Sequence, residues 1–347
     1  MEKWQNILQK SITSPEQLIR RFKIDAVPLL RVAERYPMRI TPYYSGLIQE
    51  PGDPIWRQCV PDTRELDDDL QIEDPLHEES LSPVPGLIHR YPDRVVWVIS
   101  SVCAVYCRLC LRKRQVGNAC TVAGTGQIEA ALHYIAEHAE IRDVILSGGD
   151  PLLLEDDVLD VILTRLRGIP HIEIIRIGTR TPVTLPSRIT PRLCRMLKMH
   201  HPLYINTHFN HPLEITTESV TACARLADAG IPLGNQTVLL KGVNDSPAVM
   251  KKLMQLLLKT RVKPYYIHQM DLVKGTGHFR TRIDAGIGIM ENLRGHTSGM
   301  AAPYYVIDLA GGKGKVPLLP ESVKRVDDRL LIRSYQGETV EYVDVES

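Results

Sequence analysis

Short apolar runs rich in β-branched residues alternate along most of the chain with longer segments of amphipathic pattern. The apolar runs predict buried strands at 94–100, 143–146, 172–178, 203–207, 233–240 and 263–269. The segments between them predict helices at 127–137, 158–166, 191–199, 218–229 and 246–258. Strands separated by helices favour parallel βαβ units. The pattern alone does not separate an open doubly wound sheet from a barrel. Both arrangements place an active site at the carboxyl ends of the strands.

The first ninety residues lack the regular alternation of strands and helices. Residues 14–22 begin like a capped helix, 41–61 are rich in Pro and Gly, and 65–75 form an acidic run that we expect to be a solvated surface. We therefore predict a helical and extended N-terminal appendage at 1–90, a main domain at 91–300 and a short C-terminal segment at 301–347.

Composition narrows the class of protein. The net charge of a chain of 347 residues is only +1, which argues against a nucleic-acid-binding surface. Because we find neither a long apolar run nor the pattern of a signal peptide, we expect a cytoplasmic protein with no membrane contact. The scattered cysteines Cys59, Cys120, Cys194 and Cys223 are expected to be reduced thiols and not a disulfide framework.

Three closely spaced cysteines follow the first predicted strand of the main domain. Cys103, Cys107 and Cys110 have a C-x3-C-x2-C spacing. Three thiolates can hold an iron-sulfur cluster, and without a fourth cysteine one iron stays open to another ligand. A structural zinc site is the alternative, although zinc usually takes four protein ligands.

Polar residues and glycines follow the later strands. Ser147, Gly148, Gly149 and Asp150 come directly after the second strand, where paired glycines allow backbone to approach a ligand or form a plain turn. His208 stands at the end of the fourth strand and Gln236 lies in the fifth. Each is a candidate for the site or a hydrogen-bonded structural residue.

Near the C-terminus, two carboxylates precede a glycine-rich loop with lysines. Asp271 and Asp308 both end apolar runs and together could hold a cationic group such as an alkylammonium, although each could also cap a turn. The loop at 311–315 contains Lys313 and Lys315. Its lysines could bind an anion, lie in solvent, or form a Schiff base with pyridoxal phosphate (PLP).

The cysteine spacing and the glycine pair resemble the radical S-adenosylmethionine (SAM) superfamily. The stretches 82–94, 147–152, 294–299 and 308–317 resemble, more narrowly, the lysine 2,3-aminomutase family, over about 53–317. The resemblance implies a partial (β/α)6 barrel that carries a [4Fe-4S] cluster, SAM and PLP. It also implies that an amino group of L-lysine migrates from C2 to C3 after a radical made from SAM removes a hydrogen atom from C3.

The resemblance assigns roles to individual residues. Cys103, Cys107 and Cys110 would ligate the cluster. The PLP-binding lysine falls on Lys315, although Lys313 is a rival because it interrupts the glycines. Asp271 and Asp308 would hold the substrate ε-ammonium, and Arg112 its carboxylate. The remaining cofactor-binding positions would be Tyr91 and Arg94 near PLP, and Ser147, Gly148, Gly149, Asp150, His208 and Gln236 near SAM.

Two departures point to one branch of the family. Lysine-degrading members have a zinc-binding C-terminal extension, whereas this sequence has Ser246 at one expected ligand position and no cysteine after Cys223. The short form resembles the branch that makes (R)-β-lysine for elongation factor P. Implied partners are that factor with its lysyl ligase, an electron donor such as flavodoxin, and a second copy in a homo-oligomer. A free-lysine aminomutase, a PLP-independent radical SAM enzyme and a non-catalytic metal module are the alternatives.

Overall fold

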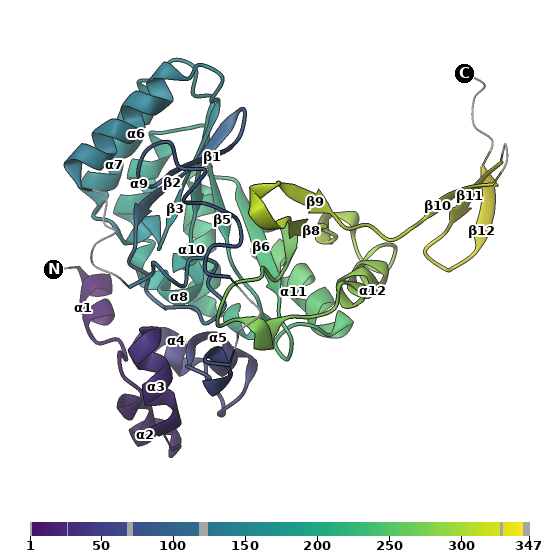
Figure 1. Cartoon of the computed structure of the whole chain (residues 1–347), viewed down its shortest axis with the longest axis horizontal. Helices are drawn as coiled ribbons and strands as arrows, with labels where there is room; N and C mark the ends of the chain where they lie inside the picture. Colours follow the sequence, from purple (N-terminus) through teal and green to yellow (C-terminus); the bar gives the residue numbers. More distant parts are fainter. Residues whose placement is uncertain (1, 26, 68–71, 118–123, 327–328, 343–347) are drawn as a thin grey trace.

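One curled sheet dominates the computed structural model, which describes residues 2–25, 27–67, 72–117, 124–326 and 329–342 (Figure 1). Within these residues nine strands pair in chain order. The strands are β1 (Leu87–Tyr91), β2 (Arg94–Ser100), β3 (Asp143–Gly148), β4 (Ile174–Gly178), β5 (Leu203–Thr207), β6 (Leu233–Leu239), β7 (Lys263–Gln269), β8 (Tyr304–Asp308) and β9 (Lys315–Pro317). Cys120 and part of the acidic run, 68–71, lie outside the described residues.

Neighbouring strands from β2 to β8 are parallel, and β1 and β9 pair antiparallel at the two edges. The six predicted strands are confirmed as β2 to β7, with ends within two residues of the prediction. The partial α/β barrel is therefore confirmed, although its sheet is wider than six strands. The two edge strands were missed because they are short and carry no continuous apolar run.

Helices cover the outer face of the sheet (Figure 1). They are α6 (Thr125–Glu137), α7 (Asp156–Arg167), α8 (Thr181–Thr184), α9 (Pro191–Lys198), α10 (Thr217–Asp228), α11 (Pro247–Lys259) and α12 (Ile283–Leu293). The five predicted helices are confirmed as α6, α7, α9, α10 and α11. In α7 the buried Leu159, Ile162, Leu163 and Leu166 show the spacing of a helix with one apolar face.

Burial alternates along the strands because successive side chains point to opposite faces. In β7, Ile267 is buried against the helices, while Tyr266 and His268 are only half-buried. In β6 the same alternation leaves Gln236 half-buried between buried neighbours. The half-buried residues therefore line the inner face of the half-barrel, where polar side chains are available for a site.

The N-terminal helices are packed against one end of the barrel (Figure 1). They are α1 (Lys3–Gln9), α2 (Glu16–Phe22), α3 (Val27–Arg35), α4 (Pro42–Gly46) and α5 (Pro54–Cys59). Thr41 Oγ1 donates to the carbonyl of Thr184 at 2.7 Å, and the hydroxyls of Tyr43 and Thr216 are 2.6 Å apart. The main sheet itself runs through both predicted domain boundaries, since β1 ends at Tyr91 and β8 begins at Tyr304.

The acidic run is exposed at Asp67 and Glu73, as expected, but its first residue, Glu65, is not. Glu65 is only 1% exposed. Its carboxylate accepts hydrogen bonds from Arg108 Nε at 2.9 Å and from Lys113 Nζ at 2.7 Å. Burial raises the pKa of Glu65, but the charges of Arg108 and Lys113 outweigh that effect and hold it below its usual value. Both cations come from the cysteine-bearing loop, so Glu65 anchors that loop to the N-terminal segment.

We expect Glu65→Gln to destabilise the protein markedly. The change leaves two buried cations without their counter-ion, which typically costs about 3–5 kcal/mol. Chemical denaturation of the full chain without added cofactors measures this. Glu129→Gln is the matched control, because Glu129 pairs with Arg165 on the exposed surface. Equal transitions for the two variants would contradict the anchor.

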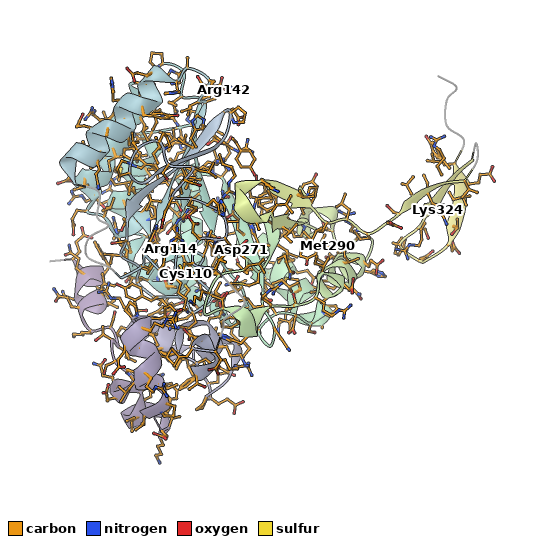
Figure 2. The ribbon with its side chains drawn as sticks, in the orientation of Figure 1. Cys110, Arg114, Arg142, Asp271, Met290 and Lys324 are labelled. Carbon is orange, nitrogen blue, oxygen red and sulfur yellow. The ribbon has the colours of Figure 1, made fainter. Side chains whose placement is uncertain are left out.

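A second, smaller sheet projects from the body (Figure 1). It consists of β10 (Val323–Val326), β11 (Arg329–Arg333) and β12 (Thr339–Tyr342), paired antiparallel. Lys324 in Figure 2 marks its position. None of the helices in the described residues has the length and apolar character that a membrane span requires.

Candidate active site

The three cysteines lie in the loop that leaves the carboxyl end of β2. All three are free thiols with partial exposure. Burial, and then proximity to Cys107, raises the pKa of Cys110 to about 11. Burial is also the main cause that raises the pKa of Cys103, to which Cys110 adds. Thiols that resist ionisation in a dry site become good ligands when a metal cation supplies the compensating charge.

The three cysteine thiols do not converge on one point. Among the described residues, no three His, Cys, Asp or Glu side chains are close enough together to bind one metal ion jointly. A tetrahedral zinc site requires such convergence. In an iron-sulfur cluster each cysteine binds a different iron, so the thiolates need not meet at one point. Cysteine thiolates are the donors that hold iron-sulfur clusters, so the three cysteines fit a cluster by their chemistry.

The glycine pair after β3 packs directly on the cysteine loop. A Cβ on Gly149 would lie 2.5 Å from the carbonyl oxygen of Val102, so only glycine allows this approach. Gly148 adopts a φ of +120°, and its Cβ would lie 2.2 Å from the carbonyl oxygen of Ser100. The two glycines thus bring the exit of β3 against the loop that carries the cysteines.

The carboxylate of Asp150 is hydrogen-bonded to other residues of the protein. Its carboxylate accepts hydrogen bonds from Thr179 Oγ1 at 2.6 Å, from the amide of Arg180 at 2.8 Å and from the amide of Leu152 at 3.1 Å. Burial raises its pKa. Asp150 therefore ties the exits of β3 and β4 together. Its assignment to SAM stays a prediction, and the contacts indicate a positioning role there.

Arg112 connects the cysteine loop with the glycine segment. Its guanidinium forms a bidentate ion pair with Glu78, in which Nε donates to Oε2 at 2.9 Å and Nη2 donates to Oε1 at 2.7 Å. Its Nη1 donates to Ser147 Oγ at 3.3 Å. Glu78 is 6% exposed. Arg112, the predicted ligand of the substrate carboxylate, therefore lies beside Ser147. Its guanidinium is already paired with the carboxylate of Glu78.

The strand register places Lys315 opposite Asp308. The two residues are cross-strand partners in the β8–β9 pair. The Lys315 ammonium contacts Asp308 Oδ2 and lies 3.3 Å from His268 Nδ1. Burial raises the pKa of Asp308, but hydrogen bonding to His268 and the charge of Lys315 outweigh it and hold the pKa below its usual value. Asp308 is thus shown in contact with an alkylammonium group.

The glycine-rich loop gives Lys315 its position. Gly311, Gly312 and Gly314 all have positive φ, between 70° and 97°, so the loop folds back tightly from β8 to β9. The amide of Lys315 donates to Tyr91 Oη at 2.9 Å. Lys313, two residues earlier, is exposed. The geometry favours Lys315 as the lysine of the site.

Unpaired donors beside Lys315 fit an anionic, nitrogen-containing cofactor. Arg90 Nη1 lies 3.5 Å from Asp308, while Arg90 Nε and His268 Nε2 are buried without a hydrogen-bond partner in the described structure. Tyr91 and Arg94 pair across the β1–β2 turn, with the guanidinium 3.9 Å from the ring centroid. A phosphate and a pyridine ring would satisfy such groups, so these residues fit PLP.

Asp271 follows β7 and faces the same charges. No described residue donates a hydrogen bond to its carboxylate. Burial, and then the negative charge of Asp308, raises its pKa to about 7, while Lys315 and Arg90 act in the opposite direction. The Asp271 side chain is half-buried. A half-buried carboxylate whose charge the neighbouring cations do not fully compensate can bind a further cation.

We expect the Michaelis constant for a cationic substrate to depend on pH through Asp271. An ammonium group binds the ionised carboxylate, which predominates only above pH 7. Below pH 7 the affinity should therefore fall by up to tenfold per pH unit, and above it the affinity should level off. Steady-state kinetics from pH 6 to 8.5 measure this. Asp271→Asn should remove the dependence, and its persistence in that variant would assign it to another group.

His208 and Gln236 are adjacent on neighbouring strands. His208 is hydrogen-bonded to the backbone of Gln236, and burial is the main cause that lowers the pKa of His208 to about 3, with the charges of His268 and Arg180 adding to it. The imidazole is therefore neutral at physiological pH. Its position between Arg180, near the cysteines, and His268, near Lys315, places it between the two halves of the site.

Four site residues were not singled out from the sequence. They are Glu78, Arg90, Arg180 and His268. His268 and Arg180 sit at the ends of β7 and β4, so reading every strand exit would have identified both. Arg90 is next to Tyr91 in a stretch used for the family resemblance. Glu78 lies in the proline-rich N-terminal part and has no local signal.

Comparison with known proteins connects both halves of the site to one group of enzymes. The pattern of the Radical SAM superfamily matches residues 97–253, and that described as Lysine-2,3-aminomutase matches 290–347. The L-lysine 2,3-aminomutase of Fusobacterium nucleatum is 51% identical and covers 92% of this chain and 76% of its own.

Two further relatives and one solved structure are also similar to this chain. A glutamate 2,3-aminomutase of Clostridioides difficile is 46% identical over 99% of this chain and 82% of its own. The L-lysine 2,3-aminomutase of Haemophilus influenzae is 33% identical over 90% and 95%. A crystal structure of a radical SAM methyltransferase from Sphaerobacter thermophilus, 18% identical, has a TM-score of 0.43 over 65% of this chain and 72% of that one.

Proposed function

Because this chain belongs to the L-lysine 2,3-aminomutase family of radical SAM isomerases, we propose that it converts L-lysine to (R)-β-lysine for the modification of elongation factor P. The observation that carries the lysine assignment is the contact between the Lys315 ammonium and Asp308, with Asp271 nearby. That pair of carboxylates has the charge required by the ε-ammonium of lysine.

Each group of site residues has a distinct role in the proposed reaction. Cys103, Cys107 and Cys110 would hold the cluster, and Lys315 would hold PLP. When bound, the cluster supplies the electron that cleaves SAM, and PLP supplies the conjugated ring that makes migration of the amino group accessible. The chain contributes charge selection by Asp271 and Asp308, orientation of the substrate carboxylate by Arg112, and enclosure of the site from water.

The same charges argue against glutamate as the substrate, although one relative is a glutamate 2,3-aminomutase. A second carboxylate on the substrate would face Asp308, which stays ionised, and Asp271. Like charges in a buried site repel strongly. Lysine places a positive charge at that position instead.

The link to elongation factor P is the finer part of the proposal. Its support is Ser246, which stands where lysine-degrading relatives are expected to have a zinc ligand. Ser246 precedes α11 and its side chain is exposed. The factor and its lysyl ligase would consume the product, flavodoxin would supply electrons, and the enzyme would work as a homo-oligomer. Free-lysine catabolism or β-lysine biosynthesis is the alternative destination.

Anaerobic turnover with SAM, PLP and a reductant tests both the lysine assignment and the link to elongation factor P. L-Lysine and L-glutamate are supplied in parallel, and the products are separated on a chiral phase. We expect (R)-β-lysine and no β-glutamate. β-Glutamate as the main product would overturn the lysine assignment. The (S) isomer of β-lysine would overturn only the link to elongation factor P. Transfer of the product to the factor by its ligase completes the test.

A further inference from the structure

A buried arginine contacts one of the cluster cysteines. Arg180 follows β4, and its Nη1 lies 2.7 Å from Cys107 Sγ. The side chain is 11% exposed. A guanidinium cannot lose its proton in a protein, so it is a permanent positive charge beside the sulfur.

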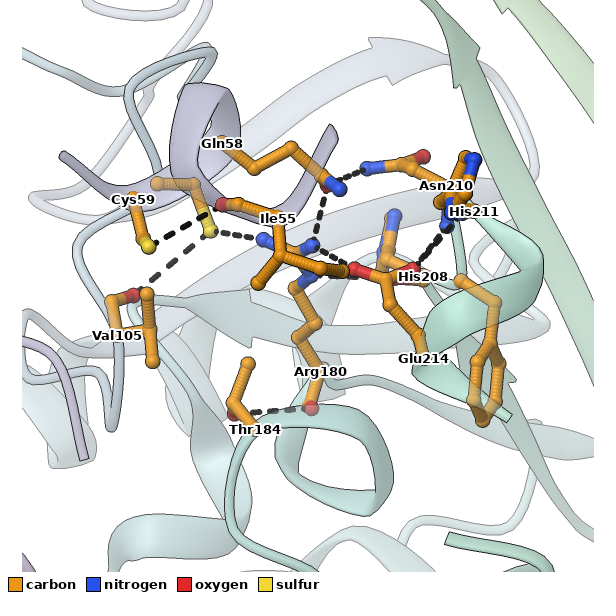
Figure 3. A network of polar contacts seen from close by, with 12 residues as sticks. Ile55, Gln58, Cys59, Val105, Arg180, Thr184, His208, Asn210, His211 and Glu214 are labelled. Carbon is orange, nitrogen blue, oxygen red and sulfur yellow. Dashed lines mark hydrogen bonds and ion pairs between the residues drawn. The ribbon is translucent and has the colours of Figure 1, made fainter. Parts of the chain in front are cut away.

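The position of this guanidinium is fixed by several acceptors. Its Nη2 donates to Gln58 Oε1 at 2.6 Å and to Glu214 Oε1 at 2.7 Å, while Nε donates to the carbonyl of His208 at 3.1 Å (Figure 3). Nη2 also donates to Tyr44 Oη at 3.0 Å. These partners come from α5, α4 and the segment after β5. The charge is therefore held in place from both the N-terminal helices and the barrel.

Glu214 supplies the opposing charge and is itself held firmly. Its side chain is completely buried. Oε1 also accepts from Tyr44 Oη at 2.6 Å, and Oε2 accepts from the amides of Asn210 and His211 at 2.6 and 3.0 Å. The cysteine sulfur thus faces an ordered sequence of charges, first the cation of Arg180 and then the anion of Glu214.

Charges at this distance act on the electron affinity of an iron-sulfur cluster. Reduction adds one electron to the cluster, taken from an external one-electron donor, and breaks no bond in the protein. Hydrogen bonds to the sulfurs and nearby positive charge stabilise the reduced form, whereas negative charge destabilises it. Low exposure weakens solvent screening of both effects.

We propose that Arg180 and Glu214 form an opposed pair that sets the reduction potential of the cluster bound by Cys103, Cys107 and Cys110. Arg180 favours the reduced cluster through its hydrogen bond to Cys107. Glu214 holds the guanidinium in place and limits the strength of its charge. The two residues are positioning residues, which act through Cys107. The inference rests on the cluster and not on the substrate.

Replacing each member separately should shift the potential in opposite directions. Arg180→Gln removes the cation and leaves Glu214 uncompensated, so the ratio of reduced to oxidised cluster at the wild-type midpoint should fall at least tenfold. This corresponds to about 59 mV for one electron. Glu214→Gln leaves the cation uncompensated, and the same ratio should rise. Arg180→Lys keeps the charge and should lie closer to wild type.

The measurement is a redox titration of the anaerobically reconstituted full chain without lysine or SAM. The reduced cluster is followed by electron paramagnetic resonance, and iron and sulfide are counted for every variant. Arg142→Gln is the control, since Arg142 pairs with Glu173 on the surface and lies apart from Cys110 in Figure 2. It should titrate like the wild type.

Two results would overturn the inference. One is an unchanged midpoint in Arg180→Gln at full iron content. The other is a shift of the same sign in Arg180→Gln and Glu214→Gln, as a general distortion of the loop would produce. If Arg180→Gln does not bind iron, the sign found for Glu214→Gln decides alone. Failure of lysine turnover would leave the titration unaffected, so the two proposals are tested separately.

Discussion

Lys315→Ala is expected to abolish β-lysine formation, by roughly 10⁴-fold or more, while SAM cleavage by the reduced enzyme persists. The expectation rests on the position of Lys315, opposite Asp308 in the sheet and 3.3 Å from His268 Nδ1. Loss of a residue that binds the reacting cofactor covalently removes the chemistry and not only affinity. Product analysis, PLP absorbance and methionine release are measured on the same samples.

Lys313→Ala is the matched control for this change. Lys313 belongs to the same loop and has the same chemistry, but its side chain is exposed. Its variant should retain PLP absorbance and turnover. Equal loss in the two variants would indicate a general effect on the loop, and normal turnover by Lys315→Ala would reject the assignment.

Asp271→Asn is expected to weaken lysine binding by about 3 kcal/mol or more, roughly 10²-fold or greater in the Michaelis constant. Asparagine has the same shape as aspartate but no charge. The substrate ε-ammonium would then lose one of its two buried counter-ions. Asp271 is the better test of the pair, because Asp308 also contacts Lys315 and its replacement would disturb both.

The analogue L-norleucine makes this test specific. It lacks the ε-ammonium but has the same carbon chain, so its binding should change little in Asp271→Asn. The preference for lysine over norleucine should therefore fall by nearly the full 10²-fold. Asp284→Asn is the control, since Asp284 is 80% exposed on α12. An undiminished preference for lysine would reject the role of Asp271.

The strands of the barrel could be predicted from the sequence because their signal is local, whereas their closure into a barrel was implied only by the family resemblance. Runs such as 94–100 and 203–207 are short and rich in apolar and β-branched residues, and β2 and β5 begin and end at those residues. The positions of Cys107 and Lys315 were also predictable, since short motifs carry them. The edge strand β9 was not, because it comprises three residues whose pairing depends on the turn made by the glycines before it.

The polar networks could not be predicted, because their members are far apart in the chain. Arg180 and Gln58 are separated by 122 positions, and Arg108 and Glu65 by 43. No periodicity connects such pairs. Asp150 illustrates the same point. Its motif suggested a ligand contact, whereas the structure shows its carboxylate bound by Thr179 and Arg180.

The anchoring of the cysteine loop from the N-terminal segment limits how this enzyme can be divided. The superfamily pattern begins at residue 97, yet Glu65 binds Arg108 and Lys113 of the loop, and Gln58 and Tyr44 bind Arg180. A barrel excised near residue 90, or grafted onto another leader, would lose all of these contacts. The appendage and the barrel therefore form one structural unit, and chimaeras between relatives should exchange them together.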